Sequence, residues 1–548
     1  MPRLPVEALA DALRRLPREE FEFALRHKIL PIVSLPGLVL HAVCGPAAKM
    51  LAEAEGRKIV AEADAASFLE AVRATHGPML LREATHGLAL NHPDKSASRR
   101  LTYPQIAVGA MLGLVAIGAC FLLPGRFIWV SASLLGGLFF LAVIALRILC
   151  LLPPLPKRRE QARRLNDAEL PVYSVLVPLF REASVLGQLL RALMELDYPP
   201  EKLDIKLILE ESDILLQRAV MSIRLPPQFE VIVVPGGLPQ TKPRALVYAL
   251  RFARGNLLTI FDAEDIPEPG QLRLAAETFA ALPRDVACLQ AQLAFYNPNE
   301  NWLARQFTIE YATLFGLLLP ALAGHGLPLP LGGTSNHFRT AVLLEVGAWD
   351  PFNVTEDADL GFRLARAGYE VGTLDSRTYE EASIHLGNWL KQRTRWLKGF
   401  LATWLVHMRE PSRLLRELGP AGFWTLQALT LGVFASALLH PFCMGATVLL
   451  FFLEPATPGD ASVFMIALAG LNLMILVSGY AVAMVAGRRA LRRLGIFGWI
   501  FPLATMPAYW MLMSMAAWAA LWQFIAAPFH WNKTQHGLSS FQKRHRKR

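Results

Sequence analysis

The segment 355-TEDADLGFRL-364, followed along the chain by 392-QRTRW-396, decides the interpretation of this sequence. The first segment places three carboxylates, Glu356, Asp357 and Asp359, at the start of an expected helix, where free N–H groups and the helix dipole stabilise negative charge. A carboxylate held there among apolar side chains could act as a base toward an alcohol. The second segment carries two guanidinium groups and an indole at helical spacing, which suit a diphosphate and a sugar ring. Each segment alone is also compatible with a charged surface in water.

In this order, the two segments resemble the T-E-D and Q-x-x-R-W motifs of processive family 2 glycosyltransferases, the relatives of the cellulose, chitin and hyaluronan synthases. The resemblance covers residues 101–540. It implies that Asp357 is the base that deprotonates the acceptor hydroxyl, and that Trp396 stacks against the acceptor sugar at a channel entrance. The other residues that the motifs assign to donor or acceptor binding are Glu356, Gln392, Arg393 and Arg395, with the two arginines offsetting the charge on the departing UDP.

The composition places part of the chain in a lipid bilayer. Hydrophobic residues make up 53% of the 548 residues and charged residues only 18%. The formal net charge of +10 could indicate a nucleic-acid polymer as partner, but basic residues gather beside apolar segments, at 157–159, 488–489 and 543–548. This positive-inside pattern favours contact with anionic lipid instead. The five cysteines form no C-x-x-C pair, so we expect neither a disulfide framework nor a zinc site.

Long apolar segments predict membrane helices on both sides of a polar middle. Residues 101–153 are expected to form a transmembrane hairpin, and their basic flanks place both ends in the cytoplasm. Residues 420–528 contain two further candidates, at 426–453 and 463–486. The apolar stretch 496–527 is short for two crossings, so it predicts either a compressed hairpin or one crossing with an interface helix. The charged N-terminus lacks an early apolar core, and no cleavable signal peptide is expected.

Residues 1–95 are expected to form a small cytoplasmic α/β domain. Strands are predicted at 29–32 and 38–43, and amphipathic helices at 47–55 and 65–74. The layout resembles the N-terminal domain of type II secretion ATPases, which some membrane glycosyltransferases also carry. Related domains bind cyclic di-GMP, but the long Leu-rich repeat with paired Arg and Gln is not found in this sequence. Nucleotide binding and a plain docking or folding module therefore both stay open.

Between residues 165 and 415 the pattern alternates strands and helices, which predicts an α/β domain. The amphipathic segment 301–322 reads as an interface helix that covers a channel mouth. Ligands of such a sheet collect at the carboxyl ends of its strands, where acidic clusters occur at 210–213 and 262–265. The expected buried strands are 173–178, 203–209, 231–234, 257–261 and 286–293.

The acidic run after one of these strands, Phe261-Asp262-Ala263-Glu264-Asp265, resembles the D-x-D region of nucleotide-sugar transferases in the variant D-A-E-D. Hard oxygen ligands at a strand end suit Mg²⁺ or Mn²⁺ bridging a diphosphate. The expected ligands are Asp262, Glu264 and Asp265, and the departure from D-x-D leaves open whether Glu264 or Asp265 joins Asp262. The alternative is a helix N-cap for the following Pro-Glu-Pro.

The family resemblance assigns further contacts with the donor and the acceptor. Glu210 or Glu211 would meet the uridine, and Lys242 matches a basic residue that precedes a helix in the family. Asn336 belongs to the glycine loop 331–337, for which acceptor binding and a plain turn are both open.

The segment that follows the last apolar stretch, 528-PFHWNKTQHG-537, resembles the post-membrane F-x-W-x-K-T-x-H-G motif of bacterial cellulose-synthase-like proteins. The resemblance implies that Lys533 and His536 donate to phosphate, as the gating loop of relatives does. A basic juxtamembrane tail over 529–548 is the alternative.

These features predict a GT-A-type, Rossmann-like α/β glycosyltransferase domain embedded between transmembrane helices. The resemblance implies a bacterial inner membrane, with the N-terminus, the catalytic domain and the C-terminus in the cytoplasm. The expected activity is inverting transfer from a UDP-sugar, with UDP-glucose as the family's commonest donor, to elongate and translocate an exopolysaccharide such as a β-glucan.

The sequence leaves alternatives to this function. A non-processive transferase would make a membrane glycolipid, and a cyclic di-GMP-regulated envelope component would carry a degenerate transferase site. Envelope export proteins are further expected partners. A transporter is disfavoured because the ionisable clusters lie outside the apolar spans.

Overall fold

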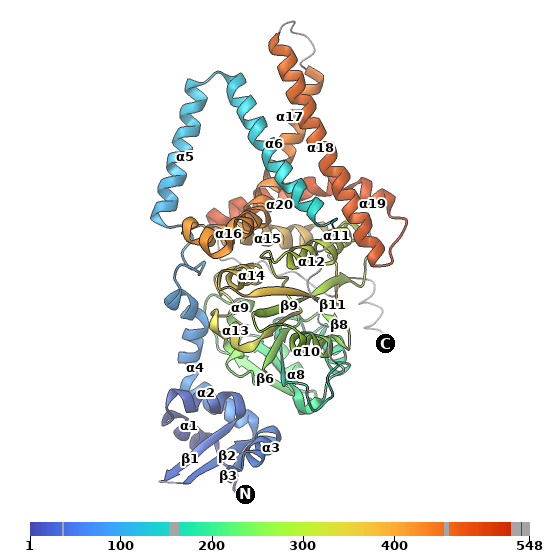
Figure 1. Ribbon diagram of the computed structural model, residues 1–548. Coiled ribbons are helices and arrows are strands. Elements are labelled where there is room, and N and C mark those ends of the chain that lie inside the picture. Colours follow the sequence, from blue (N-terminus) through green and yellow to red (C-terminus); the bar gives the residue numbers. More distant parts are fainter. Residues whose placement is uncertain (36–37, 153–163, 454–459, 528–536, 538, 540–548) are drawn as a thin grey trace.

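The computed structural model describes residues 1–35, 38–152, 164–453, 460–527, 537 and 539. Figure 1 shows three parts stacked along one axis: a small N-terminal domain, a larger α/β domain above it, and long helices that rise from the far side of the α/β domain. The long helix α4 links the first two parts. The segment 528–536, with Lys533 and His536, lies outside the described residues.

The N-terminal domain is a three-stranded sheet with helices. The sheet order is β1-β2-β3, with β1 and β2 antiparallel and β2 and β3 parallel. The two expected strands form β1 and β2, whereas β3 and the first two helices were not predicted. The elements are α1 (Val6–Arg14), α2 (Arg18–His27), β1 (Ile29–Leu35), β2 (Leu38–Cys44), α3 (Pro46–Ala54), β3 (Lys58–Ala63) and α4 (Ala65–Asn91).

The α/β domain is built on a mixed eight-stranded sheet in the order β6-β5-β4-β7-β10-β9-β11-β8. Strands β6, β5, β4 and β7 run parallel, and β10 pairs antiparallel with both β7 and β9. This is the GT-A-type sheet expected from the sequence. The strands are β4 (Tyr173–Leu179), β5 (Leu203–Glu210), β6 (Phe229–Val234), β7 (Leu257–Ile260), β8 (Ile266–Pro267), β9 (Val286–Phe295), β10 (Asn336–Arg339) and β11 (Glu370–Glu380).

Two hydrophobic cores lie on the two faces of this sheet. Odd-numbered positions of β4 and β5, such as Val175 and Leu207, pack with α7, α8 and α10, while Leu176 and Ile208 face the core that contains α9 and α14. Because successive side chains of each strand point to opposite faces, both faces of the sheet are covered by helices, as parallel strands require. The helices of this domain are α7 (Leu186–Met194), α8 (Ile214–Met221), α9 (Lys242–Leu250), α10 (Gln271–Ala281), α11 (Trp302–Thr313), α12 (Leu319–Gly324), α13 (Thr340–Glu345) and α14 (Glu356–Arg366).

A layer of helices separates the sheet from the long apolar helices (Figure 1). In this layer α15, α16 and α20 lie across the axis, and α20 packs against α15 and α17. The helices of this part are α5 (Tyr103–Leu122), α6 (Gly125–Leu149), α15 (Leu386–His407), α16 (Pro411–Gln427), α17 (Val433–Leu453), α18 (Asp460–Arg493), α19 (Ile500–Ala504) and α20 (Met506–Ala526).

Among the described residues, five helical segments are long and apolar enough to cross a membrane: Tyr103–Leu122, Gly125–Leu149, Trp302–Gly324, Pro411–Ala446 and Val463–Arg493. The first two lie within the expected hairpin 101–153, Val463–Arg493 covers the expected 463–486, and Pro411–Ala446 overlaps the expected 426–453 in part. The segment Trp302–Gly324, predicted to be an interface helix, is 56% buried, and it lies in the helical layer over the sheet. The stretch 496–527 forms α19 and α20, neither of which is among the five.

The N-terminal domain is fixed to the α/β domain by packing and by ion pairs. Helix α4 continues far beyond the predicted end at residue 74 because its second half, including Leu80 and Ala84, joins the core shared with α9. Lys28 pairs with Glu230 on β6, so the sheet edge at β6 is also engaged. The start of the linker to α5 is held as well, since Ser96 Oγ donates to Asp350 at 3.1 Å.

Candidate active site

A cavity of about 1250 Å³ lies at the carboxyl ends of β4, β5 and β7 and continues between α6, α17 and α18. Its polar end is lined by residues that the sequence singles out, and its other end by the apolar helices. The predicted residues on its wall are Glu210, Lys242, Asp262, Glu264, Glu356, Asp357, Gln392, Arg393, Arg395 and Trp396. The fold therefore brings together motifs that are up to about 190 positions apart, counted from Glu210 to Trp396.

Asp357 lies on the cavity wall at the start of α14. The indole Nε1 of Trp349 donates to Asp357 Oδ1 at 3.1 Å, which fixes the plane of the carboxylate. Burial raises the pKa of Asp357 to about 6, against the opposing effect of the Lys242 ammonium. Burial and the neighbouring Asp357 also raise the pKa of Glu356. A carboxylate that is ionised at neutral pH yet more basic than usual suits proton abstraction from an alcohol.

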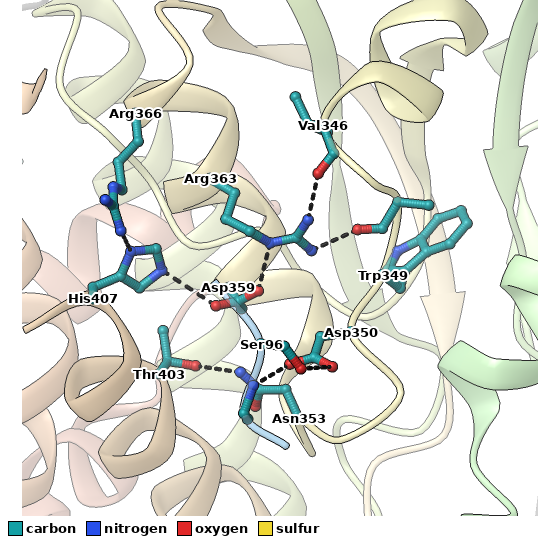
Figure 2. Close-up of polar contacts among 12 residues, drawn as sticks. Ser96, Val346, Trp349, Asp350, Asn353, Asp359, Arg363, Arg366, Thr403 and His407 are labelled. Carbon is teal, nitrogen blue, oxygen red and sulfur yellow. Dashed lines mark hydrogen bonds and ion pairs between the residues drawn. The ribbon is translucent and has the colours of Figure 1, made fainter. Parts of the chain in front are cut away.

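A buried polar network ties α14 to α15, as Figure 2 shows. Asp359 accepts from Arg363 Nε at 2.7 Å and lies 3.2 Å from His407 Nε2 on α15. Asn353, just before α14, donates to Thr403 Oγ1 on α15 at 2.9 Å. The third carboxylate of the T-E-D segment, Asp359, is therefore a structural link between the two helices that carry the motifs.

Close backbone packing reinforces this link. A Cβ added at Gly399 of α15 would overlap the side chain of Thr355, the first residue of T-E-D. Only glycine allows the two helices to approach this closely. The distance between the base on α14 and the Q-R-T-R-W residues on α15 is set by this contact.

The two arginines of Q-R-T-R-W have different environments. Arg393 is 2% exposed and forms a bidentate pair with Glu310 of α11, at 2.7 and 2.6 Å. Its guanidinium also lies 4.4 Å from the ring centroid of Trp396. Because Glu310 already neutralises the Arg393 guanidinium, this arrangement does not support Arg393 as the group that offsets charge on a departing UDP. The contact with Trp396 suits Arg393 to a positioning role instead.

Arg395 lies among the acidic residues of the site. Burial lowers the pKa of the Arg395 guanidinium, and the attraction of the Glu356, Asp262 and Asp357 carboxylates opposes this effect. Trp396 stacks on Tyr311 with ring centroids 6.1 Å apart, and both residues line the cavity. Arg395 and Trp396 both line the cavity, and their contacts with the diphosphate and the acceptor sugar stay predictions.

The predicted metal ligands do not converge on one point. Asp262 and Glu264 line the cavity, but Asp265 turns inward, where it accepts from the Thr334 hydroxyl and, at 2.7 Å, from the Asp262 amide. In the described part of the chain, no three His, Cys, Asp or Glu side chains are grouped to hold a metal. Of the two alternatives that the sequence leaves open, Glu264 rather than Asp265 lies on the cavity wall with Asp262.

A two-carboxylate site still fits a divalent cation that shares a diphosphate. Mg²⁺ is commonly bound by one or two carboxylates together with substrate phosphates. Lys242 Nζ lies 2.6 Å from Asp262 Oδ1, so a cation at Asp262 would replace this ammonium as its counter-charge. Burial and repulsion from Asp265 and Glu264 also raise the pKa of Glu380, which lies on the same wall.

The two glutamates after β5 are held by different partners. Glu210 lines the cavity and accepts from Arg244 Nη2 at 2.7 Å, whereas Glu211 accepts from the Gly236 amide at 2.8 Å and pairs with Arg73 of α4. Glu210 is therefore the one of the pair that faces the cavity.

Asn336 is not a loop residue, because it opens the short strand β10. Its side-chain amide donates to Gly332 O at 2.7 Å, and Asn336 is fully buried. The predicted acceptor contact is thus corrected to a role in shaping the glycine loop. The loop itself lines the cavity through Gly332 and Gly333, and Lys242 donates to Gly333 O.

Two residues of this site were missed from the sequence. Trp349 lies eight positions before Asp357 and no motif marks it, and Glu380 ends β11 on the cavity wall. For Glu380, the available signal was the acidic pair Glu380-Glu381 at the end of a strand of the α/β sheet. Glu381 accepts from the amides of Gly537 and Ser539, so the end of the post-membrane motif reaches this edge of the site.

Comparison with known proteins agrees with the geometry. Residues 171–399 match the family described as glycosyltransferase like family 2. A probable glycosyltransferase, YdaM, of Bacillus subtilis is 25% identical over 249 residues, which are 45% of this chain and 58% of that protein. A beta-monoglucosyldiacylglycerol synthase of Synechocystis sp. is 25% identical over 266 residues, 47% of this chain and 55% of that protein. Further matches are named for cellulose and glucomannan synthesis.

Among solved structures, the mannosyltransferase PcManGT from Pyrobaculum calidifontis, in complex with GDP-Man and Mn²⁺, has a TM-score of 0.44 and 17% identity, covering 73% of this chain and 97% of that chain. This chain spans a little over half the length of the first two curated relatives. The mixed sheet, the motifs around its cavity and the family match over residues 171–399 establish that the chain carries a family 2 glycosyltransferase domain.

Proposed function

We propose that this protein is a membrane-embedded, inverting glycosyltransferase that moves a sugar from a UDP-sugar to an acceptor lying in the cavity. One observation carries the proposal: a single cavity joins the carboxylates at the strand ends to the space between α6, α17 and α18. A donor in water could therefore reach one end, and an acceptor or product among the membrane helices could reach the other.

The residues on the wall supply the steps of such a transfer. Asp357 takes the proton of the acceptor hydroxyl while that oxygen attacks the anomeric carbon, the bond from this carbon to the UDP oxygen breaks, and the configuration inverts. Lys242 and Arg395 offset the negative charge on UDP. Trp396 provides an aromatic face for the acceptor sugar, with Arg393 and Tyr311 fixing its plane.

A divalent cation, Mg²⁺ or Mn²⁺, fits the carboxylates of Asp262 and Glu264. Bound there, it would supply Lewis-acid stabilisation of the diphosphate. Glu210, with Arg244 behind it, is placed to accept from the uracil or ribose of the donor. We also propose that Lys533 and His536 complete the donor site, since Gly537 and Ser539 reach Glu381 beside it.

Elongation of an exopolysaccharide, such as a β-glucan, is the acceptor chemistry that we favour. The membrane end of the cavity is lined by polar and aromatic side chains suited to a sugar chain, among them Trp129, Ser133, Asn472 and Tyr480. The Q-x-x-R-W motif of processive enzymes supports the same choice.

Synthesis of a membrane glycolipid is the second candidate. Much of the wall between the helices is apolar, with Phe140, Leu439 and Ile475 among its residues, and could hold the acyl chains of a lipid acceptor. The match to a beta-monoglucosyldiacylglycerol synthase supports this reading.

The proposed location is the bacterial inner membrane, with the catalytic domain in the cytoplasm. The N-terminal domain, whose layout resembles that of type II secretion ATPases, is proposed to be regulatory, with cyclic di-GMP as its candidate ligand. Envelope export proteins are proposed partners of a polymer product.

The deciding experiment supplies purified protein in vesicles with a panel of UDP-sugars and measures UDP release and product length together. Long polymer supports elongation, and a single sugar on lipid supports the glycolipid reading. Absence of UDP release with every donor in folded protein, with Mg²⁺ or Mn²⁺ present, would overturn the proposal. Chelation should abolish UDP release, and Asp262→Ala should do the same, if the cation is required.

A further inference from the structure

Four side chains from four helices meet on the cavity wall where α6 ends beside α20. Arg147 lies in the last turn of α6, His440 on α17, Tyr480 on α18 and Trp510 on α20, and all four line the cavity wall. We call these residues the Arg147 cluster. They lie outside every motif that the proposed transfer uses.

Contacts within the cluster hold the rings in place around the guanidinium. The Arg147 guanidinium carbon lies 4.8 Å from the ring centroid of Trp510. Tyr480 and Trp510 have ring centroids 5.2 Å apart, and Tyr480 Oη lies 3.2 Å from His440 Nε2. These contacts use the aromatic faces and leave the N–H groups of Arg147 available, since a cation–π contact does not consume a hydrogen-bond donor.

Among the described residues, no carboxylate balances the charge of Arg147. In this part of the chain Arg147 forms no ion pair, whereas two other cations that line the cavity do, Arg393 with Glu310 and Lys242 with Asp262. A cation on an apolar helix is costly unless an anion or water compensates it. The cluster therefore calls for an anion that comes from outside the chain.

We propose that the Arg147 cluster binds the phosphate group of a membrane lipid. A guanidinium matches phosphate geometry with paired N–H donors, and lipid phosphates lie at the depth where membrane helices end. Tyr480 and His440 add hydrogen-bonding groups beside the guanidinium. The apolar wall nearby, with Phe140 and Leu439, accommodates an acyl chain of the same lipid.

The inference rests on the proposed membrane placement of α6, α17 and α18, but not on which sugar is transferred. A UDP diphosphate is the other source of phosphate in this cavity. The proposed function places the UDP-sugar against Lys242 and Asp262 at the strand ends, on different elements from the Arg147 cluster. Competition between UDP and lipid distinguishes the two sources.

The test is native mass spectrometry of the full chain released from nanodiscs that contain phosphatidylglycerol, phosphatidylcholine and the phosphate-free glucosyldiacylglycerol. Wild type should retain the two phosphate-bearing lipids, and Arg147→Gln should lower their retention by about tenfold or more. Arg147→Lys should retain an intermediate amount, because it keeps the charge without the planar donor fork. Arg126→Gln, in the first turn of the same helix, is the matched control and should match wild type.

Folding is checked through UDP binding, which Arg147→Gln should leave unchanged. Equal lipid retention by wild type and Arg147→Gln, or equal retention of the phosphate-free lipid, overturns the proposal. Displacement of the lipid by UDP also overturns it, and assigns the cluster to the donor. If no UDP-sugar is turned over while Arg147→Gln still loses lipid, the proposed function fails and the lipid site stands.

Discussion

Opposing influences act on the proton affinity of Asp357. Burial raises its pKa to about 6, while the Lys242 ammonium and the Trp349 indole N–H favour the charged form. The residue is therefore mostly ionised at neutral pH but holds a proton more tightly than an exposed aspartate. That balance is what a general base for a hydroxyl needs.

Replacing Asp357 by Asn keeps its size and its acceptor oxygen for Trp349 but removes its basicity. Turnover should fall by roughly 10²–10⁴-fold, the usual contribution of general base catalysis. UDP affinity should change little, because Lys242 and Arg395 are untouched. The measurement is UDP release beside UDP binding, and near-normal turnover by Asp357→Asn would show that another group is the base.

The pH dependence of wild-type turnover should reflect the raised pKa of Asp357. Because the pKa of Asp357 is raised to about 6, the residue gains a proton as the pH falls through that value and turnover declines. Below it the rate should drop about tenfold per pH unit, measured at saturating donor between roughly pH 5 and 8. A rate that is flat across this interval, in protein whose melting temperature shows it to be folded, would contradict the role of Asp357.

Replacing either arginine of Q-R-T-R-W should affect a different property, the stability for Arg393 and the turnover for Arg395. Arg393→Gln leaves Glu310 without its partner, and since Glu310 is 33% exposed, the loss of stability should stay below the about 3–5 kcal/mol of a fully buried pair. Arg395→Gln should instead lower turnover while the melting temperature changes little. Glu310→Gln combined with Arg393→Gln should recover part of the lost stability. Equal melting temperatures for the two single variants would contradict this division.

At the scale of elements, α14 and α15 behave as one unit. Three contacts join the two helices. Asp359 lies beside His407, and Asn353 donates a hydrogen bond to Thr403. The side chain of Thr355 packs against Gly399. These contacts fix the position of the proposed base on α14 relative to Trp396 on α15. Since α15 also packs against α20 at the apolar part of the molecule, the catalytic geometry is joined to the helical layer beneath the membrane helices.

Gly399→Ala tests this coupling. Its new Cβ overlaps Thr355, so the two helices must separate, which should cost about 1–3 kcal/mol and lower turnover. Gly387→Ala on the same helix is the matched control, because an added Cβ there has nothing within 4 Å. Adding Thr355→Ala to Gly399→Ala should restore part of the stability. If Gly399→Ala and Gly387→Ala have the same turnover and melting temperature, the contact does not set the geometry.

The sequence predicted those parts of the site whose chemistry is local. T-E-D and Q-R-T-R-W are short motifs within single helices, and the strand that ends at Glu210 is a clear apolar run. The pairing of Arg393 with Glu310 was not predicted because Glu310 lies 83 positions away on another helix. The choice between Glu264 and Asp265 stayed open because the inward turn of Asp265 depends on Thr334, 69 positions away.

Parts of the fold were missed for the same physical reason. Strand β10 has only four residues, and it forms because β7 and β9 pair with it on both sides. The second half of α4 keeps its helix through Pro78 because it packs against the catalytic domain. Neither partner can be read from the local pattern.

At the scale of the whole molecule, the N-terminal domain meets the donor side of the catalytic domain. Lys28 pairs with Glu230, and Arg73 pairs with Glu211 next to the cavity residue Glu210. The Arg73–Glu211 pair is surface-exposed on both sides, at 43% and 42%, so it contributes little energy by itself. We therefore expect the domain to adjust donor binding without taking part in the chemistry.

A chain that starts at Ser96 tests this placement. It keeps the bonds from Ser96 and Ala97 to Asp350, and Glu230 keeps Lys206 as a partner at 2.5 Å. Transfer should continue at a basal rate, with KM for the UDP-sugar within about fivefold of wild type. Arg73→Ala in the full chain should give the same small change in KM. Complete loss of transfer in a truncated protein that is inserted and folded would contradict the expectation.

The bonds to Asp350 also bear on how the protein is made. Ser96 and its partner are 254 positions apart, so at about 5–20 residues per second a ribosome needs roughly 13–50 s between them. The surface that receives the N-terminal domain, at Glu211, Glu230 and α9, is complete once translation has passed residue 250. Until then the domain must rely on its own core, around Leu9 and Phe68. The linker is fixed later than the domain, because Asp350 is synthesised about 100 positions after α9.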